Sequence, residues 1–104
     1  MNKTLLEDLR EEQRTTIEAH VKQLYYTKSS EFAEELAKAR RKFPVQNSAH
    51  EGYAVILEEL EELWDLVKQK QSERDYSLLR KETIQLGAMV LAFLVEVVEP
   101  ENRR

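Results

Sequence analysis

The sequence contains no cysteine and only two glycines and two prolines. The absence of cysteine excludes disulfides, thiolate zinc sites and cysteine nucleophiles. Few glycines and prolines, with abundant Leu, Glu, Lys, Ala and Gln, favour long helices and few tight turns. A length of 104 residues suffices for one domain with one modest core. We therefore expect a single all-α domain over residues 1–104.

Several functional signatures are absent as well. There is no Ser/His/Asp arrangement, no phosphate-binding glycine loop and no His-rich metal spacing. The longest apolar run, residues 86–95, is too short to span a bilayer, and the stretch MNKTLLEDLR has no apolar core of the signal-peptide type. The net charge of −4 argues against nucleic acid as a partner. We expect a soluble cytoplasmic protein that binds neither membranes nor nucleic acid.

Hydrophobic periodicity divides the chain into four predicted helices, over about 5–26, 31–43, 49–70 and 76–98. Their predicted N-caps are Thr4, Ser29 or Ser30, Ser48, and Asp75 or Ser72. Thr4 and Ser48 are each followed three residues later by glutamate, which is the pattern of a capping box. Pro44 is expected to end the second helix.

The last predicted helix is apolar on nearly every side, because only Gln85 and Glu96 are clearly polar between Ile84 and Val98. Such a helix must be buried on several sides, and a chain this short offers little interior for it. We therefore expect a four-helix bundle-like domain that is completed by homodimerisation. The third and fourth helices should be antiparallel, with the fourth central to the dimer interface.

The third predicted helix carries a continuous apolar stripe formed by Tyr53, Leu57, Leu60, Trp64 and Val67. Trp64 could stack on a nucleobase. Its place on the stripe favours a contact with the core or with a second subunit instead.

Two pairs of polar residues distinguish the third and fourth helices. Glu59 and Glu62 are three residues apart, as are Glu82 and Gln85, so each pair shares one helix face. Apolar residues stand one turn before and one turn after each pair. Because buried carboxylates without partners are costly, a cation is expected nearby. If the two helices pack together, four oxygen ligands can converge on a hard cation such as magnesium.

A simpler interpretation of these pairs stays open. Glutamates three residues apart are common on helices, and most are solvated or pair with a lysine one turn away. On that interpretation the acids are incidental, and the chain is a helical dimerisation or adaptor protein.

The segment EELEE (58–62), followed after nineteen residues by ETIQ (82–85), resembles the EExxE and ExxD motifs of the MazG-like all-α nucleotide pyrophosphohydrolases. The resemblance covers about Phe32 to Val98. Members of this family hydrolyse nucleoside triphosphates, often deoxy or aberrant ones, to the monophosphate and pyrophosphate. They use magnesium and a helical bundle that is usually completed by dimerisation. The resemblance therefore implies an enzyme of this kind, with a nucleoside triphosphate as its substrate.

The same resemblance implies roles for individual residues. The metal ligands would be Glu59, Glu62, Glu82 and Gln85, and Glu58 would join the three glutamates as the supporting acid of the catalytic set. The metal would be Mg²⁺, with Mn²⁺ as an alternative. Basic side chains are also needed for the outer phosphates, and the candidates are Lys38, Arg41, Lys42 and Lys81.

Gln85 stands where the family pattern has aspartate. A neutral amide binds a hard cation more weakly than a carboxylate does. Three consequences are open: looser metal binding, compensation by a nearby acid such as Asp65, or a relative that binds nucleotide or metal without turnover.

Overall fold

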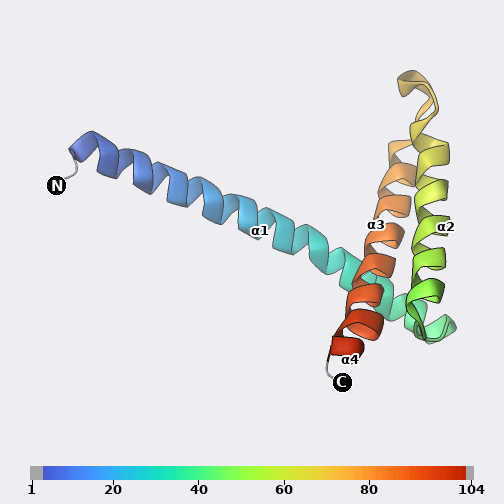
Figure 1. Ribbon diagram of the computed structural model, residues 1–104. Coiled ribbons are helices and arrows are strands. Elements are labelled where there is room, and N and C mark those ends of the chain that lie inside the picture. The colour runs from blue at the N-terminus through green and yellow to red at the C-terminus, as the bar shows by residue number, and fades with distance from the viewer. Residues whose placement is uncertain (1–3, 103–104) are drawn as a thin grey trace. The chain divides into compact units, whose positions relative to one another are not determined.

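The computed structural model describes residues 4–102, and every element in this range is helical. The elements are α1 (Leu5–Lys42), α2 (Ala49–Val67), the 3-10 turn η1 (Gln71–Glu73), α3 (Tyr76–Ala92), the π-helical segment η2 (Phe93–Val98) and α4 (Glu99–Asn102) (Figure 1). The all-α prediction is confirmed for these residues. None of the described helices is long and apolar enough to cross a membrane.

The predicted break between the first two helices is wrong, because α1 continues from Leu5 to Lys42. Ser29 and Ser30 do not cap a new helix. Their hydroxyls donate hydrogen bonds to the carbonyls of Tyr26 and Thr27, at 3.1 and 2.6 Å, within the ongoing helix. No glycine or proline lies in this region to stop it. The structure therefore has three long helical segments where four were predicted.

The chain forms two compact units, Met1–Ser30 and Glu31–Arg104. In the first unit, residues 4–30 are all exposed. The second unit contains the C-terminal part of α1 together with all later elements, and it carries every residue of the predicted site. The prediction of a single domain over residues 1–104 stays a prediction.

Within the second unit, α2 and α3 lie side by side in opposite directions, joined by residues 68–75 (Figure 1). This confirms the predicted antiparallel pairing. Small residues permit the close approach: Ala88 and Ala92 are fully buried, and a Cβ on Gly52 would lie 2.6 Å from the Phe93 ring. The helices are therefore packed closely enough for side chains from both to meet between them.

Side-chain caps fix where α2 and α3 begin. The Ser48 Oγ accepts a hydrogen bond from the Glu51 N–H at 3.1 Å, as predicted. Asp75 Oδ1 accepts from the N–H groups of Ser77 and Leu78, at 2.9 and 3.2 Å, and so Asp75 is the cap of α3. Satisfying these terminal donors stabilises each helix start and sets which residues face across the pair.

The inward face of α2 differs from the apolar stripe predicted for it. Its buried and half-buried residues are Gly52, Val55, Ile56, Glu59, Leu63 and Leu66. The predicted stripe lies on the surface, with Tyr53 63 % and Trp64 58 % exposed. On α3, residues 84–89 are at least half-buried and Val90 is exposed, and on η2 the exposed residues are Leu94, Val95 and Val98. The face that turns inward is thus the one that carries Glu59.

Candidate metal site and adjoining cavity

Three carboxylates from α2 and α3 converge between the two helices. One oxygen from each of Glu59, Glu62 and Glu82 lies within 4.8 Å of the others. Glu59 and Glu82 are half-buried, and Glu62 is exposed. The antiparallel packing brings the EExxE segment of α2 opposite the first turns of α3, so the predicted convergence of these three acids is observed.

The convergence raises the pKa of two of the acids. Burial is the main cause of raising the pKa of Glu59 to about 7, and the charges of Glu62 and Glu82 and a hydrogen bond with Glu62 add to it. Burial also raises the pKa of Glu82, helped by a hydrogen bond with Glu62 and by its charge, while the Lys81 charge opposes the rise. Burial and the repulsion between the carboxylates both penalise the ionised forms of Glu59 and Glu82 and so favour a bound proton or cation between them.

The side chains present fit a hard cation. Glu59 Oε2 and Glu82 Oε2 are buried and have no hydrogen-bond partner among the described residues. A buried anionic oxygen without a partner is costly, and a divalent cation would relieve that cost. Oxygens around Mg²⁺ lie about 3 to 4 Å apart, because each lies about 2.1 Å from the metal. The separation of at most 4.8 Å between the three carboxylate oxygens is close to this spacing.

The acid cluster gives the metal-free protein a defined pH dependence. The unfolded chain releases the Glu59 proton near pH 4.5, whereas the folded chain holds it up to about pH 7. The stabilisation from this proton is therefore complete below pH 4.5 and is lost as the pH rises through about 7. We expect Glu62→Gln, which removes a repelling charge, to raise the free energy of unfolding at high pH by about 1 to 2 kcal/mol, since water at the exposed edge screens part of the repulsion.

The measurement is chemical denaturation in the presence of EDTA from acidic to alkaline pH. The difference between Glu62→Gln and wild type should be small in acid and grow through neutrality. Glu61→Gln removes the same charge from an exposed neighbouring position and is the matched control. A difference that stays constant with pH, or that is equally large for Glu61→Gln, would contradict this account of the cluster.

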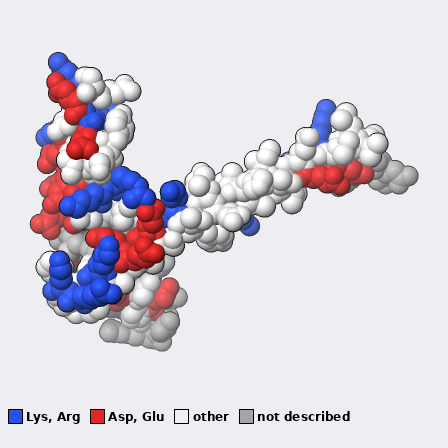
Figure 2. Space-filling model, turned by 180° about the vertical axis from the view of Figure 1, so that it is seen from behind, with Lys and Arg blue, Asp and Glu red and all other residues white. Residues whose placement is uncertain are grey.

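A cavity of about 540 Å³ opens beside the cluster. Its lining includes Glu58, Glu59 and Gln85 together with Lys38, Arg40 and Lys42 from the last turns of α1. Its apolar wall includes Phe43 and Met89. The volume is in the range of ordinary small-molecule sites, and the wall combines both signs of charge with apolar surface. Figure 2 shows that acidic and basic side chains are also interspersed on the visible face of the second unit.

The remaining predicted residues fall in different places. Lys81 lines a second cavity of about 360 Å³, which shares Glu35, Lys38 and Gln85 with the first. Arg41 is exposed and lines neither of these two cavities. Asp65 is exposed and pairs with Lys68 at 2.8 Å, so it is not in the cluster, where it was considered as a replacement for the missing carboxylate. Of the four basic candidates, three thus border a cavity that Gln85 also lines.

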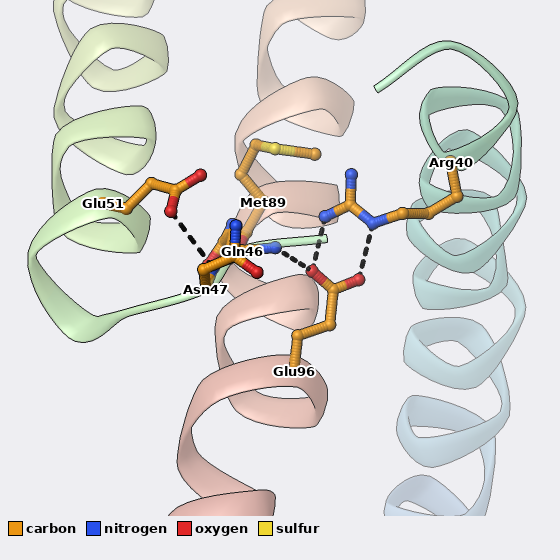
Figure 3. Close-up of polar contacts among 6 residues, drawn as sticks. All are labelled: Arg40, Gln46, Asn47, Glu51, Met89 and Glu96. Carbon is orange, nitrogen blue, oxygen red and sulfur yellow. Dashed lines mark hydrogen bonds and ion pairs between the residues drawn. The ribbon is translucent and has the colours of Figure 1, made fainter. Parts of the chain in front are cut away.

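Arg40, which lines the larger cavity, forms a half-buried ion pair with Glu96 that sequence analysis missed. Arg40 donates from Nε and Nη2 to the two oxygens of Glu96, each at 2.6 Å, and the Gln46 N–H donates to Glu96 Oε1 at 2.9 Å (Figure 3). The Gln46 side chain donates to the Met89 carbonyl at 3.3 Å. Although burial acts to raise the pKa of Glu96, the Arg40 and Gln46 hydrogen bonds and the Arg40 charge outweigh it and lower that pKa.

One signal could have found this pair. Glu96 is a lone carboxylate in an otherwise apolar stretch, and such a residue needs a charged or hydrogen-bonding partner. The run Arg40-Arg41-Lys42 offers three possible partners, and the sequence does not say which one turns inward. Nothing in the sequence marks Gln46, although it is 5 % exposed.

No family model, curated protein or solved structure matches this chain. The resemblance to the MazG-like pyrophosphohydrolases therefore stays a prediction, and the function proposed below depends on the site itself.

Proposed function

We propose that the protein is a nucleoside triphosphate pyrophosphohydrolase that converts a ribo- or deoxynucleoside triphosphate to the monophosphate and pyrophosphate with the help of Mg²⁺. The observation that carries this proposal is the cluster of Glu59, Glu62 and Glu82, which stands beside a cavity of nucleotide size with basic side chains on its wall. The motif resemblance at residues 58–62 and 82–85 points to the same chemistry.

The cluster would hold the metal through the buried oxygens of Glu59 and Glu82, with Glu62 closing the site from its exposed side. Gln85 lines the cavity one helical turn after Glu82 and offers a carbonyl oxygen as a further ligand. Bound Mg²⁺ would supply electrostatic stabilisation to the phosphate oxygens as charge builds up on them.

Lys38 and Lys42 would attract the triphosphate, because both line the cavity and neither forms an ion pair with a described residue. Glu58 lines the same cavity beside Glu59 and would orient the attacking water. The water oxygen would form a bond to the α-phosphorus, and the bond from that phosphorus to the bridging oxygen of pyrophosphate would break. A carboxylate of the site would accept the proton of the water.

The direct test is a pyrophosphate-release screen over the common and modified ribo- and deoxynucleoside triphosphates, with Mg²⁺ or Mn²⁺. We expect release for at least one substrate, and EDTA should abolish it. If no nucleotide is hydrolysed but calorimetry shows metal or nucleotide binding, the chain is an impaired relative. If neither binding nor turnover is found, the hydrolase proposal fails.

We propose further that the active form is a homodimer. The face of α2 formed by Tyr53, Leu57, Leu60, Trp64 and Val67, hereafter the outer stripe, is apolar and exposed, and the cluster lies on the other side of the helix. Exposed apolar surface of this extent marks interaction sites. A second copy covering the outer stripe would leave the cavity open. The same stripe favours the second candidate function, a helical dimerisation or adaptor protein.

We expect wild-type protein to be dimeric at micromolar concentration and Trp64→Glu to be monomeric, because a charge on the outer stripe would be buried without a partner in the dimer. Sedimentation equilibrium measures the change. Tyr26→Glu alters an exposed aromatic residue of α1, outside the stripe, and should stay dimeric. A monomeric wild type, or a Trp64→Glu variant with unchanged mass, would refute the interface.

A further inference from the structure

The Arg40–Glu96 pair leaves part of the arginine available to a ligand. A guanidinium has five N–H donors, and Glu96 accepts from only two of the nitrogens, Nε and Nη2. Among the described residues, Nη1 has no hydrogen-bond partner. Figure 3 shows this nitrogen turned away from the Glu96 carboxylate. The edge formed by Nη1 and Nη2 therefore retains two parallel donors.

The position of this edge places it at the nucleoside end of the cavity. Gln85 and Met89, the α3 residues that line the cavity, are four residues apart, which corresponds to about 6 Å at 1.5 Å per residue. Glu59 of the cluster lines the cavity, and so do Arg40 and Gln46, which contact Glu96. A triphosphate held at the cluster would direct its nucleoside toward Arg40.

Charge also distinguishes Arg40 from the two lysines. The charge of Arg40 is already compensated by Glu96, and the side chains of the pair are only 20 % and 12 % exposed. Lys38 and Lys42 have no such partner and suit the phosphates. Arg40 thus offers two donors whose positive charge is already neutralised by Glu96. Phe43 and Met89 line the same cavity with apolar side chains, and this combination suits the edge of a neutral aromatic ring.

We propose that Arg40, oriented by Glu96, recognises the base of the bound nucleotide through its Nη1–Nη2 edge and selects a base that presents two adjacent acceptor atoms. Guanine does so with O6 and N7, and cytosine with O2 and N3. Adenine places its amino group beside N1 and N7, and uracil places an N–H between its two carbonyls. Binding of either adenine or uracil would bring an N–H of the base against an N–H of Arg40, with no acceptor between them. This inference depends on the proposal that the cavity holds a nucleotide.

The test is calorimetric binding of GMP, CMP, AMP and UMP, which needs neither metal nor turnover. We expect GMP or CMP to bind wild-type protein at least about tenfold more tightly than AMP and UMP, because hydrogen bonds to a charged group are among the strongest in proteins. In Arg40→Lys the ammonium keeps the ion pair with Glu96 but cannot offer a second edge. The preference should fall to less than about threefold in the folded variant.

Arg14→Lys makes the same exchange at an exposed position of α1 outside both cavities and should keep the preference. If Arg40→Lys does not fold, Arg40→Gln, whose amide can still donate to Glu96, is measured in the same way. Equal affinity of the wild type for all four monophosphates, no binding of any of them, or an undiminished preference in the Arg40 variant would each overturn the proposal. Equal affinity for all four monophosphates would also show that the cavity binds nucleotides without selecting the base.

The two proposals fail in different ways. Selective binding of GMP or CMP without pyrophosphate release from any triphosphate would contradict the hydrolase and support the role of Arg40. Hydrolysis of all four triphosphates at equal rates, with equal monophosphate affinities, would support the hydrolase and contradict the role of Arg40.

Discussion

Replacing Glu59 by glutamine is expected to reduce the rate of pyrophosphate release by more than about 100-fold. Removing a residue that only holds a metal ligand in place costs up to about 100-fold, and we expect the loss of the ligand itself to cost more. The pKa of Glu59 is raised to about 7, and its buried Oε2 has no hydrogen-bond partner among the described residues. Glutamine keeps the size of the side chain but removes the charge that a hard cation needs. The measurement is the initial rate of pyrophosphate release at saturating Mg²⁺.

Glu61→Gln is the matched control for this loss. Glu61 lies two residues away on the same helix, is exposed and is not in the cluster, so the exchange changes the net charge equally. It should keep most of the activity. Glu59→Gln should also melt at the same temperature as wild type or higher in EDTA, because it removes repulsion. Full activity in Glu59→Gln, or an equal loss in both variants, would show that the cluster does not carry the reaction.

The convergence of the acids could be predicted because it depends on short-range rules. A spacing of three places Glu59 and Glu62 on one helix face, and caps at Ser48 and Asp75 set the starts of α2 and α3. Once two such helices pack antiparallel, their facing residues follow from the register. The apolar residues around the pairs indicated which faces would turn inward, and for Glu59 this was correct.

The errors come from tertiary context. Ser29 or Ser30 was expected to cap a second helix, but without a glycine or proline the first helix continues, and both hydroxyls donate to carbonyls of that helix. On α2 the apolar stripe was expected to contact the core or a second subunit, and the exposure of Tyr53 and Trp64 excludes the core of the single chain. A sequence does not state whether an apolar face meets its own chain or a second copy.

The Arg40–Glu96 pair was missed for a related reason. Its two members are 56 residues apart, so neither helical periodicity nor motif spacing relates them. Their contact depends on how the end of α1 meets η2, the π-helical segment that carries Glu96. The Glu96 side chain is only 12 % exposed there. Long-range polar contacts of this kind require the packed structure.

Exchanging Gln85 for aspartate is expected to tighten Mg²⁺ binding by about 10- to 100-fold, because the number of charged ligands is a main determinant of affinity at sites for hard cations. Gln85 lines the cavity beside Glu59 and lies one turn after Glu82, so a carboxylate there would join three others. In EDTA the added repulsion should lower the melting temperature, and millimolar Mg²⁺ should more than restore it through linkage. Calorimetric titration and thermal melts, each with and without Mg²⁺, measure both effects.

Turnover then separates the remaining interpretations of Gln85. If the wild-type site is active but binds its metal loosely, Gln85→Asp should raise pyrophosphate release at low Mg²⁺ and change it little at saturation. Gln69→Asp adds the same charge at an exposed position outside the cavity and should alter neither quantity. Tighter Mg²⁺ binding without turnover from either protein would favour the impaired relative. Unchanged Mg²⁺ affinity would place Gln85 outside the metal site, because a fourth carboxylate within reach of the same cation cannot leave its binding free energy unaltered.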